Sequence, residues 1–472
     1  MLFDTCHIGG IEAKCRLVRS ATFEGMGNYG LPTEKLAQMY ENLADGGAGI
    51  IITGMMATTK MEPRQHCQIR IDDDECIAPL SQVVHRVHQH GGKIIAQLVV
   101  MGSAILLPEI PEGETRIIIS PSGVTEKVGK WTQESQALTV DQIHELTEAV
   151  AKAAARAKAA GFDGVQFHGA HGYLASKFLS PHFNTRTDAY GGSLENRARF
   201  LLECVAAMRQ AVGTDYPVWV KLNCADFMKD GSMTFEESKQ VMTWLADMGV
   251  NAIEVSGGNT SSLPRKGPIR AIRRTKEPMY FKAYASEAAA MLKDKIDVGV
   301  VGGFRKVEDI EDTLESTDLA FVSMSRPYLR QPDLPNRWKS GDTEPALCIS
   351  CSRCFGAEDV DCIFNKQKKS ETRRLKKRKS PRVHRINKSN GLFSQKGAAL
   401  WQSSSSLPSY SAAYCSSSAC PSPTPLPSIS GRLSTSKARA DGAGNWPMHP
   451  GPIRWARSRI MNCICAGSAA LP

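Results

Sequence analysis

The sequence predicts an α/β protein built on a (β/α)₈ barrel, the TIM-barrel fold, over residues 1–340. Eight short apolar runs alternate with longer amphipathic stretches, a pattern typical of parallel strands joined by helices. Eight repeats of this unit allow the sheet to close into a barrel. An open, doubly wound sheet is the alternative, and the absence of a G-x-G-x-x-G motif after the first strand argues against it.

The predicted strands have the length and the apolar character of buried parallel strands. They lie at Arg16–Arg19, Gly49–Thr53, Lys93–Leu98, Gly164–His168, Val218–Leu222, Ala252–Val255, Val298–Val301 and Leu319–Val322. Helices are predicted between them, most clearly at Val140–Ala160, Leu194–Val212, Phe235–Met248 and Lys306–Leu314. Glycine follows three of these helices, at Gly161, Gly213 and Gly249, where glycine commonly ends a helix.

The stretch Leu98–Gln136 has no helical pattern and contains several Pro and Gly. We expect a long loop there, with a hairpin, after the third strand. Loops at this end of a barrel usually shape the substrate pocket.

The charge of the chain is unevenly distributed. The 472 residues carry a net charge of +10, but residues 366–472 hold 19 of the 58 Lys and Arg and only 2 of the 48 Asp and Glu. Residues 1–365 therefore contain 39 basic and 46 acidic residues, a net charge of −7. This mildly acidic body lacks the basic surface that nucleic-acid binding requires, so no nucleic-acid partner is expected for it.

Residues 366–472 differ in character from the body. They begin with the polybasic run KQKKSETRRLKKRKSPR and continue with a Ser- and Pro-rich stretch. Such a composition buries too little apolar surface to fold, so we expect a disordered, low-complexity C-terminal tail or a gene-model artefact. A basic arm that binds nucleic acid or an anionic membrane is the functional alternative. We assign the tail no catalytic role.

Cysteine usage and the N-terminus predict a cytoplasmic protein. Ten of the 14 cysteines lie in residues 1–365 and only four of them cluster, as expected in a reducing compartment. The first residues, MLFDTCHIGG, lack the charged and apolar regions of a signal peptide. The sequence has no run of 18 apolar residues, so no membrane span is expected.

The fourth predicted strand ends in the most reactive set of side chains. His168 and His171 are three residues apart, and Tyr173 follows them. Reactive groups of a barrel lie at the C-terminal ends of its strands. Two imidazole donors there could hold a carbonyl oxygen on which charge develops, and a tyrosine hydroxyl could supply a proton. A metal site and a purely structural role are the alternatives, although no Asp, Glu or Cys stands nearby as a third ligand.

The third and fifth strands add polar groups to the same end. Gln97 ends an apolar run and can donate and accept hydrogen bonds at once. Lys221 places a cation in an otherwise apolar strand. Since an unpaired buried charge is costly, we expect an anionic ligand beside Lys221. A salt bridge to a carboxylate of a neighbouring strand is the alternative.

The seventh and eighth strands end in VVGGF and FVSMSRP. Loops after these strands commonly form the phosphate site of a barrel. Gly302 and Gly303 present unobstructed backbone amides, Ser325 adds a hydroxyl and Arg326 adds a fixed charge. This combination predicts a phosphorylated ligand.

At these strand ends the sequence resembles the old yellow enzyme family of NADH:flavin oxidoreductases. The most specific match is HGAHGYLASKFLSPHFNTRTDAYGGSLENRARF, and others are RLVRSATFEG, VKLNCADF, EVSGG, VGGF and SMSRPYLRQPDLPNRW. The resemblance covers roughly Met1 to Phe364. Within the family, the sequence most resembles the branch that contains 2,4-dienoyl-CoA reductase and the enoate reductases.

The resemblance implies non-covalent FMN and NADH or NADPH as electron donor. Ala21 and Thr22 would lie beneath the flavin edge, Gly54 and Gln97 would contact the isoalloxazine, and Lys221 would lie at N1 and O2. Gly302, Gly303, Ser325 and Arg326 would hold the phosphate. His168 and His171 would grip the carbonyl oxygen of an enone, an enoate or an enoyl-CoA-like substrate, and Tyr173 would protonate it at Cα. A homo-oligomer is compatible with this resemblance.

The sequence departs from the family pattern at three places. Phe23 stands where several members carry Cys or Thr, and Lys221 stands where many use Arg, which keeps the charge but loses the planar fork. The stretch LVVMGS after Gln97 replaces a common HAGR pattern. The flavin potential and the substrate pocket are therefore expected to differ from those of other members.

Residues 341–365 form a cysteine-containing extension of the predicted barrel. Cys348, Cys351, Cys354 and Cys362 have the spacing C-x₂-C-x₂-C-x₇-C, and four thiolates so spaced could bind an iron–sulfur cluster or zinc. The related branch carries a [4Fe–4S] cluster at about this point, with a different spacing. Free thiols are the alternative.

Three functions are compatible with the sequence. The first is an ene-reductase that transfers hydride from NAD(P)H through flavin N5 to an activated C=C bond. The second is a flavin barrel that oxidises amines or steroid or bile-acid rings. The third is a nucleic-acid-binding or scaffold protein that acts through its basic tail.

Overall fold

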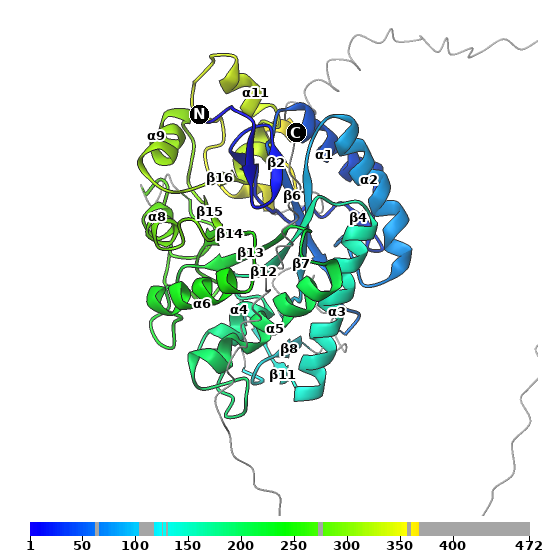
Figure 1. Cartoon of the computed structure of the whole chain (residues 1–472), viewed down its shortest axis with the longest axis vertical. Coiled ribbons are helices and arrows are strands. Elements are labelled where there is room, and N and C mark those ends of the chain that lie inside the picture. The colour runs from blue at the N-terminus through cyan, green and yellow to red at the C-terminus, as the bar shows by residue number, and fades with distance from the viewer. Residues whose placement is uncertain are drawn as a thin grey trace, which may run out of the picture. The chain divides into compact units, whose positions relative to one another are not determined.

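The computed structural model describes residues 1–61, 66–102, 118–124, 126–128, 131–271, 277–355 and 360–367, without the side chains of 126–128, 131–133 and 355. Eight parallel strands form a closed barrel at its centre, in the spatial order β3-β6-β7-β12-β13-β14-β15-β16 (Figure 1). Their bounds are β3 (Leu17–Arg19), β6 (Ile50–Ala57), β7 (Ile94–Val99), β12 (Gly164–Gly169), β13 (Val218–Asn223), β14 (Ala252–Ser256), β15 (Asp297–Val301) and β16 (Phe321–Met324).

The predicted (β/α)₈ barrel is thereby confirmed, and all eight predicted strands are present. Strand β6 differs from its prediction in length, because it continues to Ala57 instead of ending at Thr53. Its pairing with β7 shifts register between Ile52 and Met55. Such a bulge adds a residue to one strand and redirects the side chains that follow it. It is not visible in the sequence, because every residue of the strand is buried.

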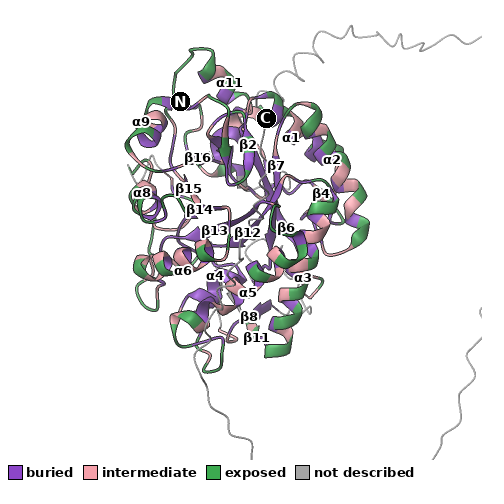
Figure 2. Ribbon diagram, in the orientation of Figure 1, coloured by how far each residue is buried: buried purple, intermediate pink, exposed green. Residues whose placement is uncertain are grey.

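Helices surround the strands (Figure 1), and the helices carry exposed residues on their outer faces (Figure 2). The helices following β3 to β7 are α1 (Glu34–Asp45), α2 (Ile77–Gln89) with the preceding 3₁₀ turn η1 (Asp74–Cys76), and α3 (Val140–Ala159). Those following β12 to β16 are α4 (Leu174–Leu179), α5 (Leu194–Val212), α6 (Phe235–Asp247), α8 (Lys282–Met291), α9 (Val307–Ser316), α10 (Arg326–Arg330), α11 (Leu334–Lys339) and the 3₁₀ turn η2 (Arg353–Phe355). The four helices predicted most clearly correspond to α3, α5, α6 and α9.

Local sequence explains where these helices begin and end. Thr139 and Thr234 each form a capping box with the residue three positions later, at the starts of α3 and α6. Gly213 ends α5 with φ of 85°, a conformation that an L side chain rarely adopts. Gly161 and Gly249, after α3 and α6, have φ of 90° and 76°, so the predicted glycine ends are confirmed, whereas the two capping boxes were not predicted.

The N-terminal hairpin closes one end of the barrel. It consists of β1 (Cys6–Ile8) and β2 (Ile11–Ala13), and its apolar side chains pack in one cluster with Val18, Ile52 and Trp219 of the barrel interior. The Trp219 Nε1 donates a hydrogen bond of 3.0 Å to the Gly9 carbonyl. Since this end is sealed by apolar packing, the opposite end, formed by the C-terminal ends of the strands, is left for polar chemistry.

The segment predicted as a long loop with a hairpin contains short strands. Residues 103–117 lie outside the described part of the chain. Beyond them come β8 (Ile118–Ser120), β9 (Glu126–Val128), β10 (Trp131–Gln133) and β11 (Ser135–Ala137). Strands β9 and β10 form an antiparallel hairpin, as predicted. A further two-stranded hairpin, β4 (Gly27–Asn28) with β5 (Leu31–Pro32), follows β3.

Within the described residues, no helix has the length and apolarity needed to cross a membrane. The predicted tail begins at residue 366, and residues 368–472 lie outside the described part of the chain.

Candidate functional site

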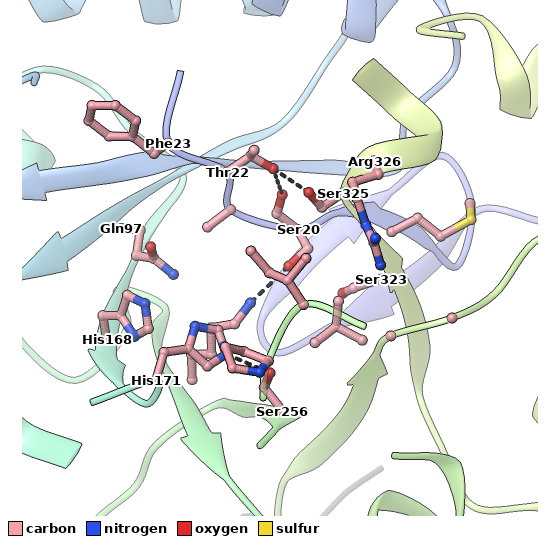
Figure 3. A pocket seen from close by; sticks show the side chains of 18 of the residues that line it. Ser20, Thr22, Phe23, Gln97, His168, His171, Ser256, Ser323, Ser325 and Arg326 are labelled. Atoms are coloured by element: carbon pink, nitrogen blue, oxygen red, sulfur yellow. Dashed lines mark hydrogen bonds between the residues drawn. The ribbon is translucent and has the colours of Figure 1, made fainter. Parts of the chain in front are cut away.

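A cavity of about 410 Å³ opens at the C-terminal ends of the barrel strands. Eleven of the twelve residues predicted for catalysis and cofactor binding line it, and Figure 3 shows several of them. They are Ala21, Thr22, Gln97, His168, His171, Tyr173, Lys221, Gly302, Gly303, Ser325 and Arg326. The cavity therefore joins the ends of strands that are far apart in the sequence.

The histidine pair and the tyrosine form one wall. The His168 ring lies 5.0 Å from the His171 ring and 4.7 Å from the Tyr173 ring, both edge to face. His171 has φ of 66°, an uncommon backbone conformation for a residue other than glycine. It allows the chain to turn sharply between β12 and α4, so that all three rings gather at one place.

Hydrogen bonds define the donor atoms of the two imidazoles. The Ala170 amide donates to His168 Nδ1 at 3.3 Å, so the neutral His168 ring carries its hydrogen on Nε2. His171 Nε2 lies 2.7 Å from the Ser256 hydroxyl, which also lines the cavity. Sequence reasoning did not assign Ser256 a role, because a serine that ends an apolar strand gives no distinctive signal.

Burial keeps these groups in their neutral forms. It lowers the pKa of His168 well below its usual value, and the nearby His171 and Lys221 lower it further. Burial and Lys221 act on the pKa of His171 in the same direction. Burial raises the pKa of Tyr173. At neutral pH the wall thus presents uncharged imidazoles and a protonated phenol.

A polar edge runs from Gln97 to Lys221 beside this wall. The Lys221 ammonium donates to Glu254 Oε2 at 2.9 Å and to the Ser20 hydroxyl at 2.8 Å. The salt bridge to a neighbouring strand, left open by the sequence, is therefore present. It does not remove Lys221 from the cavity, whose wall the side chain still forms.

The opposite end of the cavity is cationic. Arg326, which begins α10, and Arg305, after β15, both line it. Neither forms an ion pair with a described carboxylate, and burial together with the neighbouring Arg326 lowers the pKa of Arg305 although Cys348 opposes this. Two like charges without a counter-ion in the described part of the chain indicate an anionic ligand. Arg305 was missed because it lies beyond the VGGF motif.

Glycines make room at this cationic end. Gly302 and Gly303 have φ of 122° and 91°. A Cβ on Gly302 would lie 2.6 Å from the Tyr280 ring, and one on Gly303 would lie 2.5 Å from the Met279 amide nitrogen. The chain can pass this place only with glycine. The Thr22 and Ser325 hydroxyls, 2.6 Å apart, complete this end.

Gly54 is the predicted residue that does not line the cavity. Its amide donates to Glu24 Oε1 at 2.8 Å, and a Cβ on Gly54 would lie 1.7 Å from Glu24 Oε2. Glu24 also pairs with Arg19 at 2.9 Å and accepts a hydrogen bond from Tyr40 at 2.7 Å. In this structure Gly54 makes room for a buried carboxylate that supports the segment of Ala21 and Thr22.

The four cysteines of the extension line a second, small cavity of about 20 Å³, which shares Arg326 with the first. Within the described residues, no group of three or more His, Cys, Asp or Glu side chains is arranged to hold a metal ion. The volume is about that of one water molecule. Burial raises the pKa of the Cys354 thiol to about 11. This arrangement gathers the four thiols around one small cavity, but it does not bring three of them to a common metal position.

Comparisons with known proteins agree with the geometry. Residues 1–344 match the model of the NADH:flavin oxidoreductase / NADH oxidase family. An NADH oxidase of Thermoanaerobacter brockii is 33% identical over 359 residues, 75% of this chain and 53% of that protein. A cinnamate reductase of Clostridium sporogenes is 31% identical over 390 residues, 77% of this chain and 57% of that protein.

A solved structure of morphinone reductase in complex with tetrahydroNAD superposes with a TM-score of 0.57 and 26% identity, covering 72% of this chain and 90% of that one. Of the NADH oxidase and the cinnamate reductase, in contrast, the chain spans only about half the length. The resemblance inferred from the strand-end motifs is confirmed.

Proposed function

Because this chain belongs to the NADH:flavin oxidoreductase / NADH oxidase family, we propose that its cavity binds FMN and that the protein reduces activated C=C bonds with electrons from NADH or NADPH. One observation carries the proposal. His168 and His171 stand on one side of a single cavity and Arg326 on the other (Figure 3). The cavity therefore has a cationic end, which would suit an anion, and uncharged imidazoles at the other end.

The chain's own residues fit FMN. The amides of Gly302 and Gly303, with Arg326, Arg305 and Ser325, would hold its phosphate, because backbone amides and guanidinium groups bind phosphate strongly. That neither arginine pairs with a carboxylate among the described residues supports this assignment. Gln97 and Lys221 would bind the pyrimidine edge of the ring.

The chemistry that FMN supplies when bound is the transfer of hydride from the nicotinamide and then to the substrate carbon. His168 would donate from Nε2 to the carbonyl oxygen of the substrate, with His171 beside it. Ala170 holds the His168 ring and Ser256 holds the His171 ring. Because both imidazoles are neutral, they would donate directed hydrogen bonds to the substrate without giving up a proton. Tyr173, held protonated by burial, would deliver a proton to the substrate Cα.

The substrate class proposed is an α,β-unsaturated carbonyl compound, such as an enone or an enoate. Apolar side chains on the cavity wall, among them Phe23, Met55 and Ile269, are suited to a hydrophobic substrate body. The name of the related cinnamate reductase agrees with an enoate.

Steady-state assays test this assignment. The purified chain should oxidise NADH or NADPH in the presence of cyclohexenone or cinnamate, and it should not reduce electron acceptors with amine donors. Turnover with amine or steroid donors but not with enones would favour the oxidative alternative. Salt-sensitive RNA binding that disappears on deleting residues 366–472 would favour the scaffold alternative.

An iron–sulfur or zinc centre at Cys348, Cys351, Cys354 and Cys362 stays a prediction. The gathering of the four thiols around one cavity supports it, whereas the small volume opposes it. Iron, labile sulfide and zinc assays on anaerobically purified protein decide the matter. Stoichiometric metal would mean that the extension adopts another arrangement when loaded.

A further inference from the structure

Five polar side chains, contributed by five different strands or their ends, form a continuous chain beneath the cavity. Gln97 Nε2 donates to Gln166 Oε1 at 2.7 Å, and Gln166 Nε2 donates to Glu254 Oε2 at 3.0 Å. Lys221 then joins the same Glu254 oxygen to Ser20. Gln97, Lys221 and Ser20 line the cavity, whereas Gln166 and Glu254 do not. The chain thus links cavity residues through two residues behind the wall.

The register of the barrel creates these contacts. Gln97 and Gln166 are direct partners across β7 and β12, and Lys221 and Glu254 are direct partners across β13 and β14. Side chains at paired positions of neighbouring parallel strands project to the same face. The polar groups therefore meet inside the barrel, directly beneath the cavity.

Lys221 keeps one hydrogen for a ligand. An ammonium group has three donors, and two are used by Glu254 and Ser20. Lys221 borders the cavity, and its third hydrogen has no acceptor among the residues that the structure describes, so it remains for a ligand there. Gln97 is oriented in the same way. Its amide nitrogen donates to Gln166, and its oxygen, which receives no hydrogen bond from a described residue, can accept one from a ligand.

Glu254 carries a negative charge at this place. Its side chain is fully buried, and its second oxygen, Oε1, has no hydrogen-bond partner among the described residues. Burial would raise the pKa of Glu254, but the charge of Lys221 and hydrogen bonds from Ser20, Lys221 and Gln166 hold it below its usual value. The ammonium of Lys221 is therefore opposed by a carboxylate 2.9 Å away.

We propose that Glu254 is a positioning residue that lowers the electron affinity of the flavin by opposing the charge of Lys221 and fixing the donors of the polar edge. This inference rests on the proposed binding of FMN. Reduction of an isoalloxazine adds negative charge to its pyrimidine edge, and an unopposed ammonium would stabilise that charge. A carboxylate behind the ammonium reduces this stabilisation, because the pair has no net charge.

The test is the midpoint potential of the flavin in the purified holoenzyme. Glu254→Gln keeps the size and a hydrogen-bond acceptor but removes the charge. The ratio of the affinity for reduced FMN to the affinity for oxidised FMN should be about tenfold higher, or more, in this variant than in the wild type. For a two-electron couple this is a positive shift of the midpoint potential of about 30 mV or more. Glu237→Gln, which removes the carboxylate paired with Arg197 on the outer helix α6, is the matched control and should leave the potential unchanged.

The double variant Lys221→Met with Glu254→Leu guards against loss of folding. Replacing both members of a buried ion pair by apolar residues is often tolerated. Since both charges are removed together, the midpoint potential should stay close to that of the wild type. The ratio of the affinities for reduced and oxidised FMN, obtained from the potential by the same two-electron relation, should change by less than about threefold. A large fall in potential in this variant would mean that Lys221 acts unopposed, and would overturn the proposal.

The outcomes separate this inference from the proposed function. A wild-type protein that takes up no FMN would contradict the proposed function. A wild-type protein that binds FMN, with a Glu254→Gln variant whose potential is unchanged or lower, would contradict the role of Glu254 alone. Glu254→Asp, which keeps the charge, should stay close to the wild type.

Discussion

Replacing Gly54 by alanine tests the buried carboxylate that supports the segment of Ala21 and Thr22. The added Cβ would lie 1.7 Å from Glu24 Oε2 and 2.7 Å from the Thr22 carbonyl oxygen. Glu24 cannot turn aside freely, because its Oε1 holds Arg19 at 2.9 Å, Tyr40 at 2.7 Å and the Gly54 amide at 2.8 Å. The substitution must therefore either displace the carboxylate or push apart β6 and the segment that carries Thr22.

Both responses are costly. Overpacking a buried site usually costs about 1–3 kcal/mol, and separating a buried ion pair costs about 3–5 kcal/mol. We expect Gly54→Ala to lower the free energy of unfolding by about 3 kcal/mol or more, on the basis of these two ranges. The loss should appear in urea unfolding followed by tryptophan fluorescence, with an unchanged slope against urea.

Gly267→Ala is the control. Among the described residues, an alanine Cβ there would meet the Asn259 carbonyl oxygen alone, at 3.4 Å, so the stability should change by less than about 1 kcal/mol, as for most surface substitutions. If Gly54→Ala were equally mild, the contacts of Glu24 described above would not hold the segment in place.

Three further predictions concern the cavity. In stopped-flow assays, Tyr173→Phe should slow the half-reaction with an enone about 10²–10⁴-fold and leave flavin reduction by the nicotinamide nearly unchanged. The Tyr190 hydroxyl donates to Glu203 outside the cavity, so the control Tyr190→Phe should affect neither half-reaction. Equal losses in both half-reactions of Tyr173→Phe would refute the proton-donor role. Arg326→Ala should weaken FMN binding about 10- to 100-fold, the loss of one charge-assisted hydrogen bond, measured by fluorescence titration of the apoprotein, and unchanged affinity would place the phosphate elsewhere. The pKa of His168 lies below its usual value of 6.5 in the folded protein, so below that pH the unfolded chain binds more protons, and the free energy of unfolding should fall on acidification by about 1.4 kcal/mol per pH unit. Urea unfolding between pH 7.5 and 5.5 should show a smaller fall for His168→Asn than for the wild type. An identical fall in both proteins would contradict this.

Much of the barrel was predictable because its strands are short apolar runs and its helices carry cap signals. The gathering of the two histidines and the tyrosine at one wall of the cavity was predictable for a related reason. His168, His171 and Tyr173 directly follow an apolar run, and the ends of parallel strands meet at one edge. Chemistry that lies at strand ends can thus be inferred from the order of residues alone.

Contacts that depend on register were not predictable. Nothing in the run Ala252–Ser256 indicates that Glu254 faces Lys221, since that requires the alignment of β13 with β14. The role of Gly54 likewise depends on the bulge of β6 and on Glu24, thirty residues earlier in the chain. Side chains such as these, buried behind a cavity wall, are found only when the strands are placed beside one another.

The flavin content of the purified chain tests the central claim most directly. We predict a yellow protein whose absorption is that of oxidised flavin, and whose heat-released chromophore is FMN in a ratio of about one per chain, the stoichiometry of a single cavity. A folded, colourless protein that takes up no FMN when it is offered would contradict the claim that this barrel is built around a phosphate-anchored flavin.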